Sequence, residues 1–224
     1  MEEIRKHHNE AKRLLIQSVV KKDQHILDVG CGFGGDLQKW HKCGVNINMC
    51  DPSSDALKEA KSRARNMKMR VNFYEGDIFK CPNRKYDIIC FNFSLHYIFQ
   101  SADLFFKSVR EIKKRMKPGG LLIGIIPDSE KIIMKTPLQD EMGNFFITKG
   151  SYGGFGEKLF VNLIDTPYYK DGAKSEPIAH KDLLWTELEK SGFRLLEWSS
   201  LEGNQISELY SRFDFLLMMT ILII

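Results

Sequence analysis

The sequence contains no pair of cysteines at C-x-x-C spacing, although it holds five cysteines in 224 residues. Most of the five lie in or beside apolar runs, a setting typical of buried free thiols in a reducing compartment. We therefore expect neither a disulfide framework nor a zinc site. The five are Cys31, Cys43, Cys50, Cys81 and Cys90.

The sequence also lacks an apolar run long enough to span a membrane. The apolar C-terminus, Phe215–Ile224, is far shorter than the roughly 20 residues of a transmembrane helix and is better interpreted as a last core strand. The charged N-terminus has no apolar run of the kind found in a signal peptide. We expect an intracellular protein without membrane contact, cytoplasmic if its source is viral and nuclear if it is cellular. Because the apolar C-terminus ends abruptly, we also expect a domain cut from a longer polypeptide.

Charge of one sign is not concentrated in any tail. The formal net charge of +4 arises from 33 basic and 29 acidic residues that are mixed along the chain. This balance permits a polyanionic partner without requiring one. With 43% hydrophobic residues, the chain can bury one sizeable core, and a second core would be cramped. We expect a single domain over residues 1–224.

Short apolar runs alternate with amphipathic helical patterns, which predicts an α/β fold with a doubly wound, mostly parallel sheet. Ligands of such sheets bind at the carboxyl ends of the strands. The expected strands are His25–Val29, Val45–Cys50, Val71–Tyr74, Tyr86–Phe91 and Leu121–Ile126, and the helices between them are Asp36–Lys42, Ser54–Asn66 and Ala102–Met116.

The later part of the chain has a weaker pattern. Leu159–Ile164 and Arg194–Ser199, around a helix near Lys181–Ser191, are expected to be the closing antiparallel strands. The stretch Lys135–Gly156 is Gly-rich and is expected to form an irregular surface excursion.

A glycine-rich segment, residues 28–36, follows the first strand and opens a helix. Glycines allow a tight turn and a close approach of the backbone to a ligand. Gly30, Gly32 and Gly35 satisfy G-x-G-x-x-G, and Asp51 lies about 20 residues further on, where an acid can hold ribose hydroxyls. The segment therefore permits a dinucleotide-dependent dehydrogenase.

Two carboxylates of this segment argue against a dinucleotide. Asp36 would place a negative charge in the helical turn that binds pyrophosphate, and Asp28 adds to the repulsion. A ligand with an ammonium and a sulfonium, such as S-adenosylmethionine, is instead attracted by both acids while Asp51 bonds its ribose. Asp77 can accept from the adenine amino group while Ile78 and Phe79 cover the ring. A simple turn role for Asp77 stays open.

Four segments together resemble the messenger-RNA cap guanine-N7 methyltransferases, including the capping enzymes of large cytoplasmic DNA viruses. The combination of -LHY-F- with G-x-I-P-D-S is more restrictive than the glycine loop. The resemblance implies a Rossmann-like class I methyltransferase fold, S-adenosylmethionine as methyl donor and capped RNA as partner, with guanylyltransferase and triphosphatase domains admitted in the same polypeptide. The segments are DVGCGFGGDLQKW (28–40), FNFSLHYIF (91–99), PGGLLIGIIPDS (118–129) and the weaker SEPIAHKDLL (175–184).

The resemblance also implies site residues. Of an N-terminal F-x-N-N-W-x-K-like segment only Asn9 and Lys12 are kept, Phe33 stands where lysine is usual, and Leu159 stands where an aromatic residue is common. The implied cofactor residues are Lys12, Asp28, Gly30, Gly32, Asp36, Asp51, Asp77, Ile78, Asn92 and Tyr97. The implied cap residues are Asn9, His96, Tyr97, Pro127, Glu176 and Tyr210. The basic helix end with Arg63 and Arg65 is either a triphosphate contact or an ordinary solvated surface.

The expected reaction is an in-line displacement in which guanine N7 attacks the methyl group of the sulfonium. N7 carries a lone pair and no proton, so we expect no catalytic acid–base pair and no metal. His96, Tyr97 and Glu176 would position the base. A purely structural role stays open for each of these residues. His96 and Tyr97 could form a strand-end cluster, and Glu176 could favour a helix N-terminus.

Two other functions remain open. One is another RNA or small-molecule methyltransferase with the same cofactor domain, in which Glu176 would not recognise guanine. The other is a non-catalytic methyltransferase-like RNA-binding subunit. The presence of Asp28, Asp51 and Asp77 argues against the second, because a domain that binds no cofactor does not need them.

Overall fold

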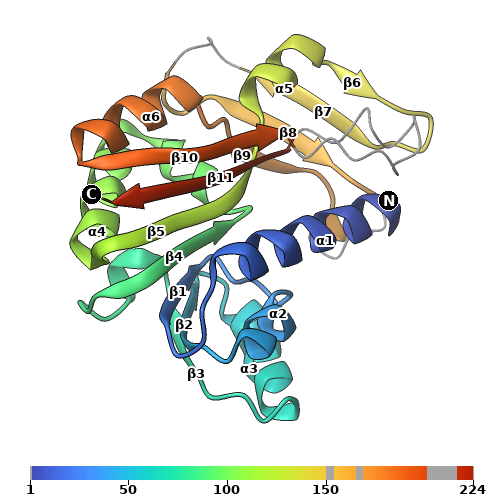
Figure 1. The fold of residues 1–224 in the computed structure, drawn as a ribbon. Helices are drawn as coiled ribbons and strands as arrows, with labels where there is room; N and C mark the ends of the chain where they lie inside the picture. The colour runs from blue at the N-terminus through green and yellow to red at the C-terminus, as the bar shows by residue number, and fades with distance from the viewer. Residues whose placement is uncertain (1, 150–153, 165–168, 201–215, 224) are drawn as a thin grey trace.

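The core of the fold is a seven-stranded sheet, seen in a computed structural model that describes residues 2–149, 154–164, 169–200 and 216–223 (Figure 1). The strand order is β10-β11-β5-β4-β1-β2-β3. Strands β1 to β5 run parallel to one another, and β11 is antiparallel to both β5 and β10. The strands are β1 (His25–Val29), β2 (Asn46–Asp51), β3 (Val71–Glu75), β4 (Tyr86–Asn92), β5 (Met116–Pro127), β10 (Phe193–Ser200) and β11 (Leu216–Ile223).

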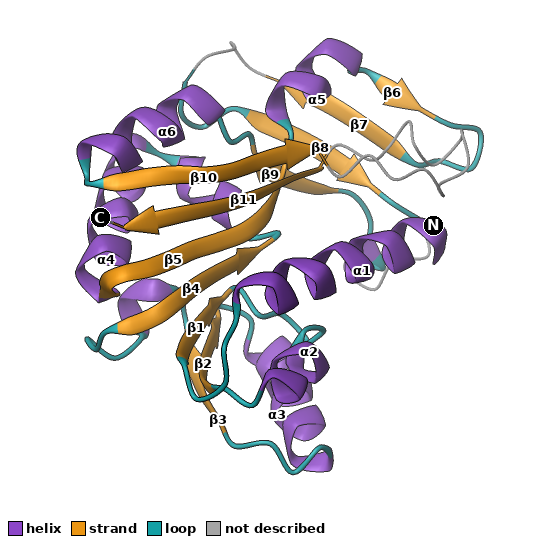
Figure 2. Cartoon of the chain, in the orientation of Figure 1, coloured by secondary structure: helices purple, strands orange, loops and turns teal. Residues whose placement is uncertain are grey.

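Helices cover both faces of this sheet, as Figure 2 shows. Along β1, Ile26 packs with the helices of one face and Leu27 with those of the other, because successive side chains of a strand point to opposite sides. The doubly wound, mostly parallel sheet predicted from the sequence is confirmed. One face carries α1 (Glu2–Val19), α2 (Leu37–Cys43) and α3 (Ser54–Asn66), and the other carries α4 (Ala102–Arg115), α6 (Lys181–Lys190) and the 3-10 turns η1 (Ile78–Lys80) and η2 (Leu95–Gln100).

A second sheet of four antiparallel strands follows β5 and α5 (Ser129–Lys135). It has its own core, in which Ile132 of the helix packs with Phe146 and Leu159 of the strands. Because α5 begins directly after β5 ends, this sheet lies at the carboxyl edge of the main sheet. Its strands are β6 (Leu138–Gln139), β7 (Phe145–Lys149), β8 (Lys158–Asn162) and β9 (Lys174–Pro177).

Two predictions about this region were wrong. Leu159–Ile164 does not close the main sheet, since β8 pairs with β7 and β9 instead. Lys135–Gly156 is not merely irregular, because it contains β6 and β7. Side chains alternate between buried and exposed along β7, and a turn in which Asp140 accepts from the backbone N–H of Asn144 at 2.9 Å precedes it. The alternation extends over only the five residues of β7, which is too short to predict a strand from the sequence.

Within the described residues, no helix has both the length and the apolar character that a membrane span requires. The five cysteines are free thiols, three of them buried.

Candidate functional site

The acidic glycine segment lies at the carboxyl edge of β1, between the ends of β2 and β4. Gly30 N and Cys31 N donate to the carbonyl of Cys50 at 2.8 and 3.0 Å, and Ser94 Oγ donates to the carbonyl of Val29 at 2.5 Å. A Cβ at Gly30 would lie 2.4 Å from Cβ of Ser94, and the φ of Gly30 is +76°. Only glycine fits at this position, which explains the first glycine of the motif.

Asp51 ends β2 and is held by the backbone. Its Oδ2 accepts from Gly32 N at 2.8 Å and its Oδ1 accepts from Ser53 N at 2.9 Å. An ionised carboxylate has about four acceptor positions, so each oxygen keeps capacity for a further donor. A pair of ribose hydroxyls matches that capacity, as the sequence predicts for this residue.

Asp36 is the centre of a buried ion cluster. Lys12 Nζ of α1 and Lys39 Nζ of α2 lie 2.9 and 2.7 Å from its Oδ1, and Asn92 Nδ2 donates to its Oδ2 at 3.1 Å. Burial raises the pKa of this carboxyl, but the two ammonium groups outweigh burial and hold the pKa below its usual value. Asp36 is therefore ionised. The structure brings together Lys12, Asp36 and Asn92 as predicted, whereas Lys39 was not among the predicted residues although it lies one helical turn after Asp36.

Asp28 lies beneath this cluster and is only 2% exposed. Its Oδ2 accepts from the indole Nε1 of Trp40 at 2.9 Å. Burial, followed by the negative charge of Asp36, raises the pKa of Asp28 to about 7. Trp40 is a core residue, as predicted, and it is also the hydrogen-bond partner of Asp28. Asp28 is therefore a buried carboxyl held by Trp40 and not an exposed contact of the site.

Among the predicted cofactor residues at the ends of β3 and β4, some stabilise the fold and one offers an acceptor to a ligand. Asp77 caps η1, since its Oδ1 accepts from Phe79 N at 3.0 Å, which is the turn role left open by the sequence. Ile78 is buried in the core while Phe79 is 36% exposed, so the exposed ring beside Asp77 is that of Phe79. Asn92 Oδ1 is buried and has no hydrogen-bond partner within the described part of the chain. It can accept from a ligand donor.

A second cluster joins η2 to the smaller sheet. His96 is 2% exposed, and its Nε2 lies 3.2 Å from Oε2 of Glu176 on β9, at ion-pair distance but without hydrogen-bond geometry. Tyr97 packs against His96 with ring centroids 4.4 Å apart. Tyr169 Oη donates to Oε1 of Glu176 at 2.8 Å. Tyr169 was not predicted, because no motif marks it.

Glu176 does not stand at a helix entry. It lies in β9 opposite Leu159 of β8, and α6 begins five residues later at Lys181, so the helix N-terminus interpretation is wrong. Burial raises the pKa of Glu176, but His96 and the hydroxyl of Tyr169 outweigh burial and keep the pKa below its usual value. The structure therefore presents a buried, ionised carboxylate beside two aromatic rings.

The remaining predicted residues are dispersed. Pro127 ends β5 at the same carboxyl edge, and Asn9 Oδ1 accepts from Lys39 Nζ at 3.2 Å. Arg63 is exposed and pairs with Glu59 at 2.8 Å. Tyr210 lies outside the described residues.

The two arginines of the basic helix end are not equivalent. Arg63 lies one turn beyond Ala60, which packs on Gly34 of the glycine loop. Arg65 instead lines a surface groove against β3, together with Lys61 and Tyr74. The lining of that groove includes no residue of the glycine loop, so the structure does not bring Arg65 to the site.

The sequence is similar to one family of known proteins. A sequence model of the mRNA (guanine-N(7))-methyltransferase domain matches residues 1–148. An mRNA cap guanine-N(7) methyltransferase of Schizosaccharomyces pombe is 32% identical over 161 residues, covering 63% of this chain and 45% of the relative. The corresponding Saccharomyces cerevisiae protein is 32% identical over 147 residues, covering 59% and 34%. The chain thus spans less than half the length of these relatives.

A solved structure shares the fold. An S-adenosylmethionine-dependent methyltransferase from Clostridium acetobutylicum superposes with a TM-score of 0.67 at 16% identity, covering 97% of this chain and 91% of that one. The Rossmann-like class I methyltransferase fold is confirmed.

Proposed function

The chain belongs to the mRNA (guanine-N(7))-methyltransferase family, and we propose that it transfers a methyl group from S-adenosylmethionine to N7 of the guanine that caps a messenger RNA. The observation that carries the proposal is that two clusters, each built on buried carboxylates, lie at one edge of the sheet. One is built on Asp36 and Asp51, and the other on Glu176.

The first cluster suits a cationic adenosyl ligand. Asp51 would hold the ribose hydroxyls. Asn92 Oδ1, which has no hydrogen-bond partner among the described residues, would accept from the ligand ammonium beside Asp36. Phe79 offers an exposed ring for the adenine. When bound, S-adenosylmethionine supplies an electrophilic methyl group on a sulfonium. The residues present fit this ligand, because Asp51 offers acceptor oxygens for a diol and Asn92 Oδ1 offers one for an ammonium.

The second cluster suits guanine. Guanine presents N1–H and its exocyclic amino group side by side, and one ionised carboxylate can accept both. Tyr169 holds Oε1 of Glu176 and His96 lies beside Oε2, so the carboxylate is oriented before a base arrives. Adenine has an acceptor at N1, which would face the carboxylate with a lone pair where guanine offers a donor. Glu176 would therefore both select guanine and reject adenine.

No proton has to be removed from N7, so these residues need only to hold and align the base. Holding two reactants in line contributes up to about 7–11 kcal/mol in favourable cases. His96 and Tyr97, packed on one another at the end of β4, would form the wall against which the guanine ring stacks.

The test is incubation with labelled S-adenosylmethionine and capped or uncapped RNA, followed by digestion to locate the label. We expect 7-methylguanosine from capped RNA alone. Glu176→Ala should lower kcat/KM about a hundredfold, equivalent to about 3 kcal/mol, with unchanged affinity for S-adenosylhomocysteine. Glu189→Ala, an exposed glutamate of α6, is the matched control. Label on a ribose oxygen, or full activity of Glu176→Ala on capped RNA, would refute the proposal.

The proposed function also implies properties of the whole protein in the cell. We infer RNA binding, a nuclear location as expected for a cellular protein, and guanylyltransferase and triphosphatase domains in the same polypeptide. A viral origin gains no support from the relatives named above, which are fungal. Immunoblotting of the native polypeptide and microscopy of the tagged protein would test the attached domains and the location.

A further inference from the structure

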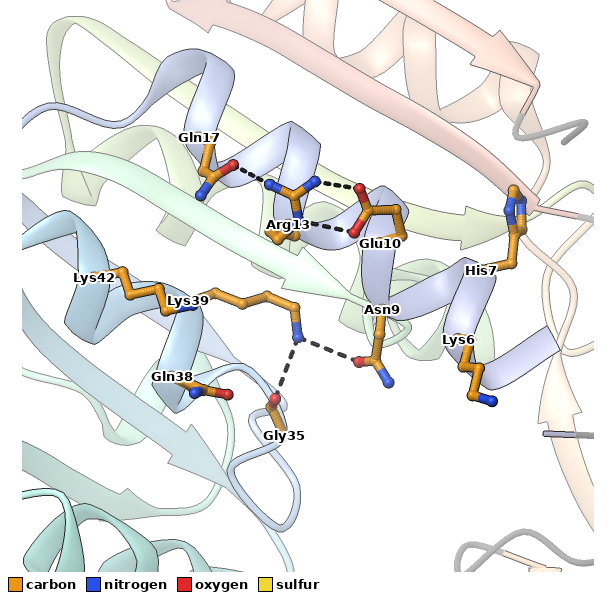
Figure 3. A pocket seen from close by; sticks show the side chains of 10 residues that line it. All are labelled: Lys6, His7, Asn9, Glu10, Arg13, Gln17, Gly35, Gln38, Lys39 and Lys42. Atoms are coloured by element: carbon orange, nitrogen blue, oxygen red, sulfur yellow. Dashed lines mark hydrogen bonds and ion pairs between the residues drawn. The ribbon is translucent and has the colours of Figure 1, made fainter. Parts of the chain in front are cut away.

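Helices α1 and α2 enclose a surface groove of about 730 Å³ on the glycine-loop side of the sheet (Figure 3). Four of its lining side chains are cations, Lys6, Arg13, Lys39 and Lys42, and one is a carboxylate, Glu10. A concave surface with this excess of positive charge attracts polyanions.

The groove is connected to the site through Lys39. Its ammonium contacts Asp36 at 2.7 Å, the carbonyl of Gly35 at 3.3 Å and Oδ1 of Asn9 at 3.2 Å, and Figure 3 shows the last two contacts. Gly35 and Asn9 themselves line the groove. The groove therefore begins where the glycine loop ends.

The walls of the groove are partly organised in advance. Arg13 donates to Gln17 at 2.6 Å and to Glu10 at 2.8 Å, so its guanidinium is fixed along α1. Lys6 and Lys42 are exposed on the two opposite helices. His7 also lines the groove, and its ring contacts that of His8. Cations placed along a groove, which follow the phosphates of a backbone, are part of the usual means of binding a single strand.

We propose that this groove holds the sugar–phosphate backbone of the first nucleotides that follow the cap. The inference rests on the proposed function, since it takes the strand to be the body of the capped substrate. An acidic protein segment would meet the same charges. RNA is favoured because the groove opens beside the glycine loop, whose proposed role is to hold the methyl donor to which the guanine of a capped RNA must be brought.

The test compares two substrates, the cap dinucleotide GpppA and a capped RNA of about ten nucleotides. The variant is Lys6→Glu combined with Lys42→Glu. The matched control is Lys107→Glu with Lys114→Glu, which makes the same charge change on α4, across the sheet.

We expect the groove variant to methylate GpppA within twofold of the unaltered protein and the long RNA at least tenfold more slowly at low salt. The salt dependence of kcat/KM on long RNA should become shallower by about 1.4 in the log–log slope, since each lost phosphate contact of a single strand accounts for about 0.7. The control should behave like the unaltered protein with both substrates.

Three results would overturn the inference: unchanged activity of the groove variant on long RNA, an equal loss on both substrates, or an equal loss in the control. Fluorescence anisotropy with an uncapped RNA of the same length separates this inference from the proposed function. If neither substrate is methylated but the unaltered protein binds uncapped RNA and the groove variant does not, the methylation proposal fails and the groove assignment stands. Binding of an acidic peptide but not of RNA would assign the groove to a protein partner.

Discussion

The buried carboxyl of Asp28 makes stability depend on pH in an unusual direction. Burial and the neighbouring charge of Asp36 raise the pKa of Asp28 from an ordinary 3.8 to about 7. Between these two values the unfolded chain has lost the proton of Asp28 while the folded chain keeps it. The folded state binds more protons, so the contribution of this group to the free energy of unfolding falls as pH rises through that window.

The magnitude follows from the pKa difference. Each pKa unit corresponds to about 1.4 kcal/mol. A rise in the pKa of Asp28 from 3.8 to about 7 therefore disfavours its ionised form in the folded state by about 4 kcal/mol above neutral pH. Asp28→Asn removes this cost and keeps an oxygen that can accept from Trp40 Nε1. We expect the free energy of unfolding of Asp28→Asn, relative to the unaltered protein, to rise by up to about 4 kcal/mol between pH 4 and pH 8.

The assay is urea unfolding of both proteins at pH intervals across that range. Titrating groups that do not interact with Asp28 cancel in the difference between the two curves, including Glu176, whose lowered pKa acts in the opposite direction. A cationic cofactor should lower the pKa of Asp28 on binding, so its affinity should rise with pH in the unaltered protein and vary less in Asp28→Asn. A stability difference that is independent of pH would refute the reasoning.

Three further predictions concern the loop and the cap pocket. Gly30→Ala should destabilise the fold by at least about 1–2 kcal/mol, the cost of a left-handed backbone, whereas Gly35→Ala, whose Cβ would meet nothing within 4 Å, should not; equal melting temperatures would contradict this. Tyr169→Phe should raise KM for capped RNA about tenfold and move the acidic limb of the pH–rate profile upward through the pKa of Glu176, and an unchanged profile would exclude a positioning role. Phe33→Lys, which restores the usual lysine at an exposed position, should steepen the salt dependence of RNA methylation by about 0.7 in slope; no change would place the RNA away from this loop.

The parallel core was predictable because its signals are local. His25–Val29 and Ser54–Asn66 have the predicted bounds, since a short apolar run and a Ser-capped amphipathic segment define themselves without distant contacts. The acids at strand ends were predictable for a related reason. Parallel strands deliver the residues that follow them to one edge, so Asp36 and Asp51 had to lie near each other.

The cap pocket could not be predicted to the same extent. Its carboxylate, Glu176, comes from a four-residue strand of a second sheet, and its partner Tyr169 lies in no periodic pattern. The contact of Glu176 with His96 depends on how the smaller sheet packs beside the end of β4, which no local pattern predicts. The helix α1 was also missed, although Ala11 and Leu15 lie four residues apart on its buried face. A charged composition concealed that spacing.

The position of Lys39 connects the cofactor cluster with the proposed RNA groove and has an energetic consequence. Its ammonium now neutralises part of the charge of Asp36. If RNA phosphates compete for this ammonium, Asp36 is left with more negative charge to attract the ammonium of an adenosyl ligand. RNA and ligand should then bind with positive coupling, and linkage requires the effect to be reciprocal.

We expect uncapped RNA to tighten the binding of S-adenosylhomocysteine about fivefold, equivalent to about 1 kcal/mol at the lower end of such couplings. Calorimetric titration with and without RNA measures this effect directly. Lys39→Met should remove the coupling, because the ammonium that both ligands sense is gone, whereas Lys42→Met should weaken RNA binding and leave the coupling at saturating RNA intact. A ligand affinity that is unchanged or weakened by RNA would show that Lys39 stays on Asp36 and that the two sites act independently.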